Sequence, residues 1–137
     1  MATQPPYEIK RTGDFSHRYA NNVQLEASPW DLKLLFGQVD QSSTPVGIHQ
    51  HTAVTVSWPE VKALIYFLRA QLAAHESQVG KIVLVPETVN APIKEPPDSV
   101  TGLQRAVWDK AYSAMNKVYA EYLRDNPEAD PDKFKAK

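Results

Sequence analysis

The stretch Ser16–Gln38, SHRYANNVQLEASPWDLKLLFGQ, decides the fold because it specifies two strands and the turn between them. Val23, Leu25 and Ala27 alternate with polar residues, which is typical of a strand with one buried and one solvated face. The SPWD sequence at 28–31 follows. Its proline fixes φ, and Ser or Asp side chains bond nearby backbone, so a tight reversal is expected. The stretch therefore predicts a β-hairpin.

The returning strand carries apolar residues on both of its faces. Leu32, Leu34 and Phe36 share one face, while Leu35 and Val39 occupy the other. A strand that is apolar on both sides is typical of the middle of a sheet. This pattern predicts that the second face also needs a partner.

After a polar loop, apolar residues again recur at every second position, and from Ser57 onward they recur at helical spacing. The run VGIHQHTAVTVSW predicts a third strand, which gives strands near 20–28, 31–40 and 46–56. Ser57 and Glu60 lie three apart with Pro59 between them, a pattern that predicts a helix near 58–78. Residues 81–85, KIVLV, return as a short strand or an extended arm. The fold class is α+β: an antiparallel meander of three to four strands packed by an amphipathic helix.

Several short motifs occur together in order: YANNV, SPWDL, LLFGQ, VTVSWPEVKAL and GKI. Over roughly residues 15–85 the chain resembles the small, mainly bacterial family of unknown function numbered 3467. The resemblance implies a shared fold unit. The family carries no established chemistry, so it implies no activity.

The segments outside that unit differ from it in composition. Residues 1–14 are expected to form a flexible arm, 15–85 the core domain, and 86–98 a proline-rich linker. A C-terminal helix is predicted at 99–126, because apolar residues recur there at helical spacing. Residues 127–137 are polar and mixed in charge, which favours a flexible tail.

Composition narrows the classes of function. The chain has 137 residues, a formal charge of -1 and no cysteine. It lacks the basic footprint of a nucleic-acid binder, and the absence of thiols excludes disulfides and sulfur-ligated metals. No signal peptide and no membrane-length apolar run is evident, so we expect a soluble, cytoplasmic protein without a cofactor.

His49 and His51 are the weak candidates for a metal site, because alternate residues of a strand point to one face. No third ligand is fixed by local spacing, since His17 and His75 are remote. A polar or interface role is therefore the better interpretation of the pair. No catalytic residue is predicted, and the enzyme reading is the weaker one.

Two classes of function remain open. The first is a non-enzymatic assembly or interaction module, most simply a homodimer. The second is a small-molecule binding protein or enzyme with a pocket between helix and sheet, using His49, His51 or Tyr19. The first is favoured because the apolar residues of the second strand and of the C-terminal helix exceed what one helix can cover. Two arrangements would bury them: the C-terminal helix folds back on its own sheet, or it crosses to a neighbouring copy. The predicted interface residues are Leu35, Val39, Trp108, Tyr112, Met115 and Tyr119.

Overall fold

The computed structural model describes residues 6–86, 89 and 93–133. The chain divides into two compact units, Met1–Leu72 and Ala73–Lys137, and each is described here by itself. Parts of the predicted N-terminal arm, linker and tail, residues 1–5, 87–88, 90–92 and 134–137, lie outside the described residues.

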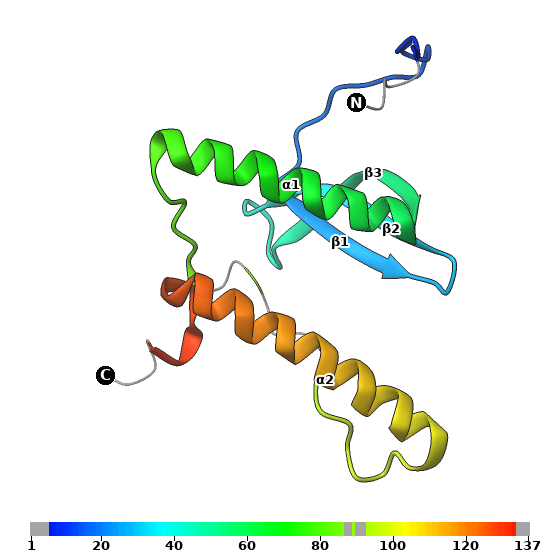
Figure 1. The fold of residues 1–137 in the computed structure, drawn as a ribbon, viewed down its shortest axis with the longest axis vertical. Coiled ribbons are helices and arrows are strands. Elements are labelled where there is room, and N and C mark those ends of the chain that lie inside the picture. Colours follow the sequence, from blue (N-terminus) through cyan, green and yellow to red (C-terminus); the bar gives the residue numbers. More distant parts are fainter. Residues whose placement is uncertain (1–5, 87–88, 90–92, 134–137) are drawn as a thin grey trace. The chain divides into compact units, whose positions relative to one another are not determined.

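The first unit contains a three-stranded antiparallel sheet in the order β1-β2-β3. Its strands are β1 (Asn22–Ala27), β2 (Asp31–Asp40) and β3 (Gly47–Ser57). Figure 1 follows them, from blue to teal, into the first helix in green. The predicted antiparallel meander is confirmed, with β2 in the middle.

The reversal between β1 and β2 is organised by Ser28. Its Oγ accepts hydrogen bonds from the backbone amides of Trp30 and Asp31, both at 3.1 Å, and donates to Asp31 Oδ1 at 2.8 Å. The Ser28 amide also donates to the Asp31 carbonyl at 2.9 Å. The hydroxyl thus replaces water for backbone groups that a tight turn leaves unpaired, as the SPWD sequence predicts.

A β-bulge interrupts the pairing of β2 with β3. Phe36 pairs with Thr52, but the next residue, Gly37, pairs with Gln50, so His51 is the extra residue. A Cβ at position 37 would lie 2.7 Å from the His49 carbonyl oxygen. Glycine is therefore needed for the close backbone approach at this bulge.

Helix α1 (Trp58–Val79) begins directly after β3, with no intervening residue. Trp58 Nε1 donates to the Ser28 carbonyl at 3.0 Å and ties the helix start to the β1–β2 turn. The helix ends at Gly80, whose φ of 94° lies in the left-handed region that favours glycine. Residues 81–85 follow as an extended arm without strand pairing.

The second unit holds α2 (Gly102–Asp125) and 3₁₀-helical turns at Pro127–Ala129 and Pro131–Lys133. Trp108 Nε1 donates to the Lys94 carbonyl at 2.9 Å, which ties the described part of the linker, residues 93–98, to α2. The turns fall in the segment that composition predicts to be a tail.

Few hydrophobic side chains are buried. Among the described residues, Leu32 and Ala129 are the buried hydrophobic ones, with 9% and 2% of their surface exposed. In the same part of the chain, no helix is long and apolar enough to cross a bilayer. The secondary structure is therefore formed, while most of the apolar surface that should stabilise it faces outward.

Candidate functional site

One face of the sheet is apolar. The strand register aligns its side chains in rows across the three strands, because alternate residues share a face. The rows of this apolar sheet face are Ala27–Leu32–Val56, Leu25–Leu34–Val54 and Val23–Phe36–Thr52. Leu32 is buried, but Leu25 remains 61% exposed. The face is covered at Leu32 in the middle strand and exposed along β1.

The opposite sheet face is largely polar. Lys33 forms an ion pair with Glu26 at 3.4 Å between β2 and β1. Predicted interface residue Leu35 lies on this face and is half-buried, in register with Gln24 and Ala53. The structure therefore places the larger apolar surface on the other face, which the two-sided pattern of β2 did not single out.

Val39 lies beyond the bulge and is half-buried. Its backbone amide donates to Asn21 Oδ1 at 2.9 Å. With Gln38, Asp40 and His49 these two residues line an open hollow of about 350 Å³. Val39 thus borders a polar recess at the end of the hairpin, apart from Leu35.

Between Val61 and Ala74, helix α1 has a wide apolar surface, interrupted on the side that carries Lys62 and Arg69, which lie seven residues apart. Lys62 and Arg69 are the only charged residues in that span. A helix with so wide an apolar surface is normally covered by other elements, yet no residue of α1 is buried. Leu68 is 60% exposed, and the other large apolar residues of the helix that are exposed are Trp58, Ile65, Tyr66, Phe67, Leu72 and Val79.

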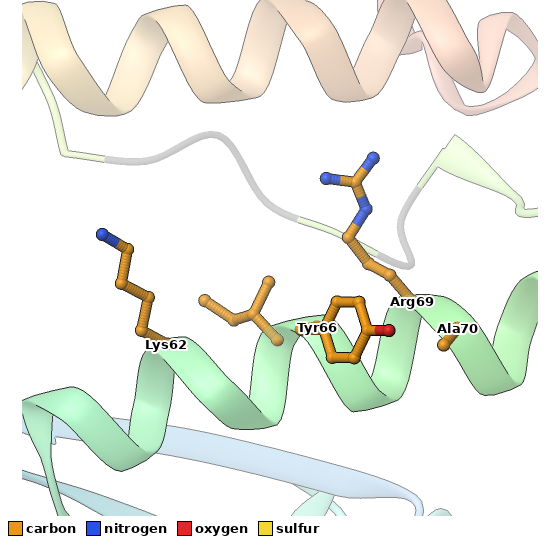
Figure 2. A pocket seen from close by; sticks show the side chains of 5 residues that line it. Lys62, Tyr66, Arg69 and Ala70 are labelled. Atoms are coloured by element: carbon orange, nitrogen blue, oxygen red, sulfur yellow. The ribbon is translucent and has the colours of Figure 1, made fainter. Parts of the chain in front are cut away.

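An open hollow of about 410 Å³ lies along one side of α1. Its lining includes Lys62, Ile65, Tyr66, Arg69 and Ala70. Figure 2 shows the labelled cationic side chains, with the Tyr66 ring between them, on the side of α1 away from the strand drawn beneath it. The hollow is a shallow part of the helix surface with two cations at its edge, rather than an enclosed pocket.

The bulge separates the two candidate metal ligands. Both ring nitrogens of His51 have partners: Nε2 with the Tyr19 carbonyl at 2.9 Å, and Nδ1 with Thr52 Oγ1 at 2.8 Å. His49 instead approaches Asp40 Oδ2 at 3.9 Å. Within the described residues, no three His, Cys, Asp or Glu side chains are grouped to hold a metal ion. The alternation that would place His49 and His51 on one face of a regular strand is broken here, because His51 is the extra residue of the bulge.

Asp40 is engaged by its own loop. The Ser42 side chain and backbone amide donate to its carboxylate and hold the pKa of Asp40 below its ordinary value, with a smaller contribution from His49. The carboxylate is thereby kept charged as an acceptor for the β2–β3 turn. Its local role is structural.

The aromatic residues predicted for an interface lie on α2. Trp108, Tyr112 and Tyr119 are half-buried, and Met115 is exposed. The Tyr119 and Tyr122 rings stack with their centroids 6.3 Å apart. The sequence thus located an aromatic side of α2, part of which already packs within its own unit.

A polar cluster that the sequence did not predict joins the arm to the end of α2. Lys81 Nζ donates to the Asp125 carbonyl at 2.9 Å and lies 3.5 Å from Glu128 Oε2. Backbone amides, first that of Glu128 itself and then that of Leu84, act with Lys81 to lower the pKa of Glu128. Loss of hydration, with a smaller effect of Glu128, raises the pKa of Tyr122. The prolines at 127 and 131, each followed by an acidic residue, were the available signal for ordered turns here.

Comparison with known proteins gives one finding. No curated protein and no solved structure matches the chain. The model of the family described as "Protein of unknown function (DUF3467)" matches residues 3–84, which include the whole sheet and α1. α2 lies beyond the matched residues. The protein belongs to the DUF3467 family.

Proposed function

We propose that this protein is a homo-oligomeric assembly module, with a twofold dimer as its simplest form. One observation carries the proposal: α1 has a wide apolar surface, interrupted on the side of Lys62 and Arg69, yet none of its residues is buried. A helix of this kind is stable in water when other elements cover it. The sheet and the turns of its own unit leave that surface uncovered.

The size of the effect favours association. Full burial of one Leu, Ile, Val or Phe side chain contributes about 1.5–3 kcal/mol. Leu25, on the sheet, and Phe67 and Leu68, on α1, each expose more than half of their surface. Soluble monomers rarely expose large contiguous apolar patches. A second copy is the simplest partner, because it brings the same unsatisfied surface to a twofold contact.

The small-molecule alternative has less support. It needs a concave pocket with convergent polar groups. His51 is hydrogen-bonded to the Tyr19 carbonyl. His49 lines the hollow beside Val39, to which neither His51 nor Tyr19 contributes. Assembly therefore remains the better-supported function.

Light scattering coupled to size-exclusion chromatography tests the proposal on the full chain. We expect a multiple of the 15.4 kDa chain mass at micromolar concentration. The variant Leu68→Gln removes one exposed apolar side chain and should shift the distribution toward the single-chain mass. His75→Gln, at an exposed polar position of the same helix, is the matched control. A wild-type chain that stays at 15.4 kDa across the concentration range would overturn the proposal.

A further inference from the structure

Helix α2 carries an exposed apolar stripe, defined here as Leu103, Val107, Ala111, Ala114 and Val118. Its spacings of four, four, three and four residues place these side chains on one side of a helix. Leu103 is 82% exposed, and Val107 and Val118 are also largely exposed. On the neighbouring side, Trp108 binds the linker through the Lys94 carbonyl. Within its own unit, the stripe is left uncovered.

The four residues of the stripe from Val107 to Val118 have the same order of side-chain sizes from either end. Ala111 and Ala114 lie equally far from a point between Tyr112 and Ser113, and so do Val107 and Val118. A twofold contact requires that when one residue meets a second, the second also meets the first. Two antiparallel copies of α2 satisfy this condition: each alanine faces the other alanine, and each valine faces the other valine. The small central residues let the helices approach closely.

Charge at the two ends of α2 also complements itself in this arrangement. The first turn has no acidic residue, and Thr101, the N-cap, makes no side-chain capping hydrogen bond. Near the other end, Glu121 and Asp125 fall on the same side as the stripe, where carboxylates oppose the negative end of their own helix dipole. Antiparallel pairing brings Glu121 of the second copy opposite Gln104, next to the positive end of α2. The acidic residues near the C-terminal end of one α2 thus lie next to the positive N-terminal end of the other, which has no acidic residue of its own.

An open apolar hollow of about 600 Å³ adjoins the first half of the stripe. Its lining consists of Leu103, Gln104, Val107, Trp108 and Ala111 from α2 and Ile93 from the linker. Val118 of a second copy lies opposite Val107 in the antiparallel arrangement. The hollow therefore offers space for the valine that the pairing delivers.

We propose that α2 pairs with α2 of a second copy, antiparallel, about a twofold axis between Tyr112 and Ser113. This inference rests on the homo-oligomer proposed above and adds to it a contact through α2, beside the one that covers α1, together with the helix direction and the axis. It assigns a role to the segment beyond the family match, since that match ends at residue 84.

Distances between identical spin labels on the two copies test the direction and the axis. The chain has no cysteine, so Ala106→Cys, Ser113→Cys and Ala120→Cys each give one labelling site on the full chain. These exposed positions are seven residues apart and lie away from the stripe. At a rise of about 1.5 Å per residue, the axial separations should be about 20 Å, about 2 Å and about 22 Å, respectively. Ser113 should therefore give the shortest distance, with longer and similar values at the other two positions.

Other patterns of distance overturn the inference. Equal distances at all three positions would indicate parallel helices, and a steady change from Ala106 to Ala120 would place the axis elsewhere. An assembled chain without measurable label pairs would show that α2 is not at the contact. In each of these cases light scattering still reports the oligomer, so the proposed function would stand. A single-chain mass would remove both proposals.

A pair of matched variants tests the stripe by a second route. Ala114→Glu places a charge at the centre of the stripe and should weaken dimerisation about tenfold or more. Ser113→Glu makes the same addition one residue away, on the exposed side, and should leave the dimer unchanged. Helical circular dichroism on both variants checks that α2 still forms. Equal dimerisation of the two variants would contradict the pairing.

Discussion

The side chains of Gln24 and Gln50 meet across the middle strand: Gln50 Nε2 donates to Gln24 Oε1 at 3.0 Å, although β1 and β3 are not neighbours. Gln50 is in register with Gly37 on β2, which has no side chain to separate the two amides. The same glycine thus permits both the bulge and a polar link over β2.

Replacing Gly37 with alanine should destabilise the sheet by about 1–3 kcal/mol, because the new methyl group would meet the His49 carbonyl oxygen 2.7 Å away. Gly13→Ala is the matched control, since a Cβ there meets nothing within 4 Å. Chemical denaturation of the two variants gives the comparison. Equal small changes would mean that β3 can shift to accommodate a side chain at the bulge.

Ser28→Ala should lower the stability of the hairpin by about 0.5–2 kcal/mol, the range seen when a capping hydroxyl is removed. The hydroxyl bonds the amides of Trp30 and Asp31, which would be left without it. Ser77→Ala also removes a hydroxyl hydrogen bond, to Ala74, but from an exposed helix position where alanine is favourable. Thermal unfolding should separate the two variants, and a Ser28→Ala chain as stable as Ser77→Ala would contradict the role assigned to the turn.

We expect the turn that contains Glu128, Pro127–Ala129, to lose stability in acid. Its folded-state pKa is lowered, so its contribution is present above the ordinary value of 4.5 and is lost as the pH falls through the folded-state pKa. The protection factor of the amide of buried Ala129, which corrects for the slower intrinsic exchange in acid, should therefore fall on acidification. Glu128→Gln should flatten this pH dependence, whereas Glu95→Gln, at an exposed position in the same unit, should keep it. Identical pH profiles for the wild type and Glu128→Gln would exclude the carboxylate as the cause.

Unfolding of the full chain should depend on protein concentration, because association stabilises the folded form by mass action. For a dimer of chains of this length, the midpoint should rise by about 2 °C for each tenfold increase in concentration. Differential scanning calorimetry between about 1 and 100 µM covers the range of typical association. A midpoint independent of concentration would be the contrary result.

The strands and both helices were predictable because their signals are local. The alternation around Leu25 and the change of period at Ser57 place β1 and the start of α1 within two residues of their observed bounds. The SPWD turn likewise needs only its own side chains to form.

The site was less predictable because its features depend on other segments. His51 becomes the extra residue of a bulge only through the approach of Gly37 from β2, so the spacing of the histidines could not reveal their separation. Glu128 gains its partners from Lys81 and Leu84, which are distant in sequence. Leu35 was predicted to lie on a second apolar face of the sheet. The strand register instead places the apolar rows on the face that holds Leu25.

The direct junction of Ser57 and Trp58 also limits how this family can vary in length. With no loop to absorb a change, an insertion or deletion there would turn all following helix side chains by about 100° about the axis relative to the strand. The β2–β3 connection, residues 41–46, has no such constraint, since an added residue there can be accommodated in the loop. We therefore expect insertions and deletions among relatives at residues 41–46 and not at the strand–helix junction. The rotation of α1 about its own axis relative to β3 should then be the same throughout the family.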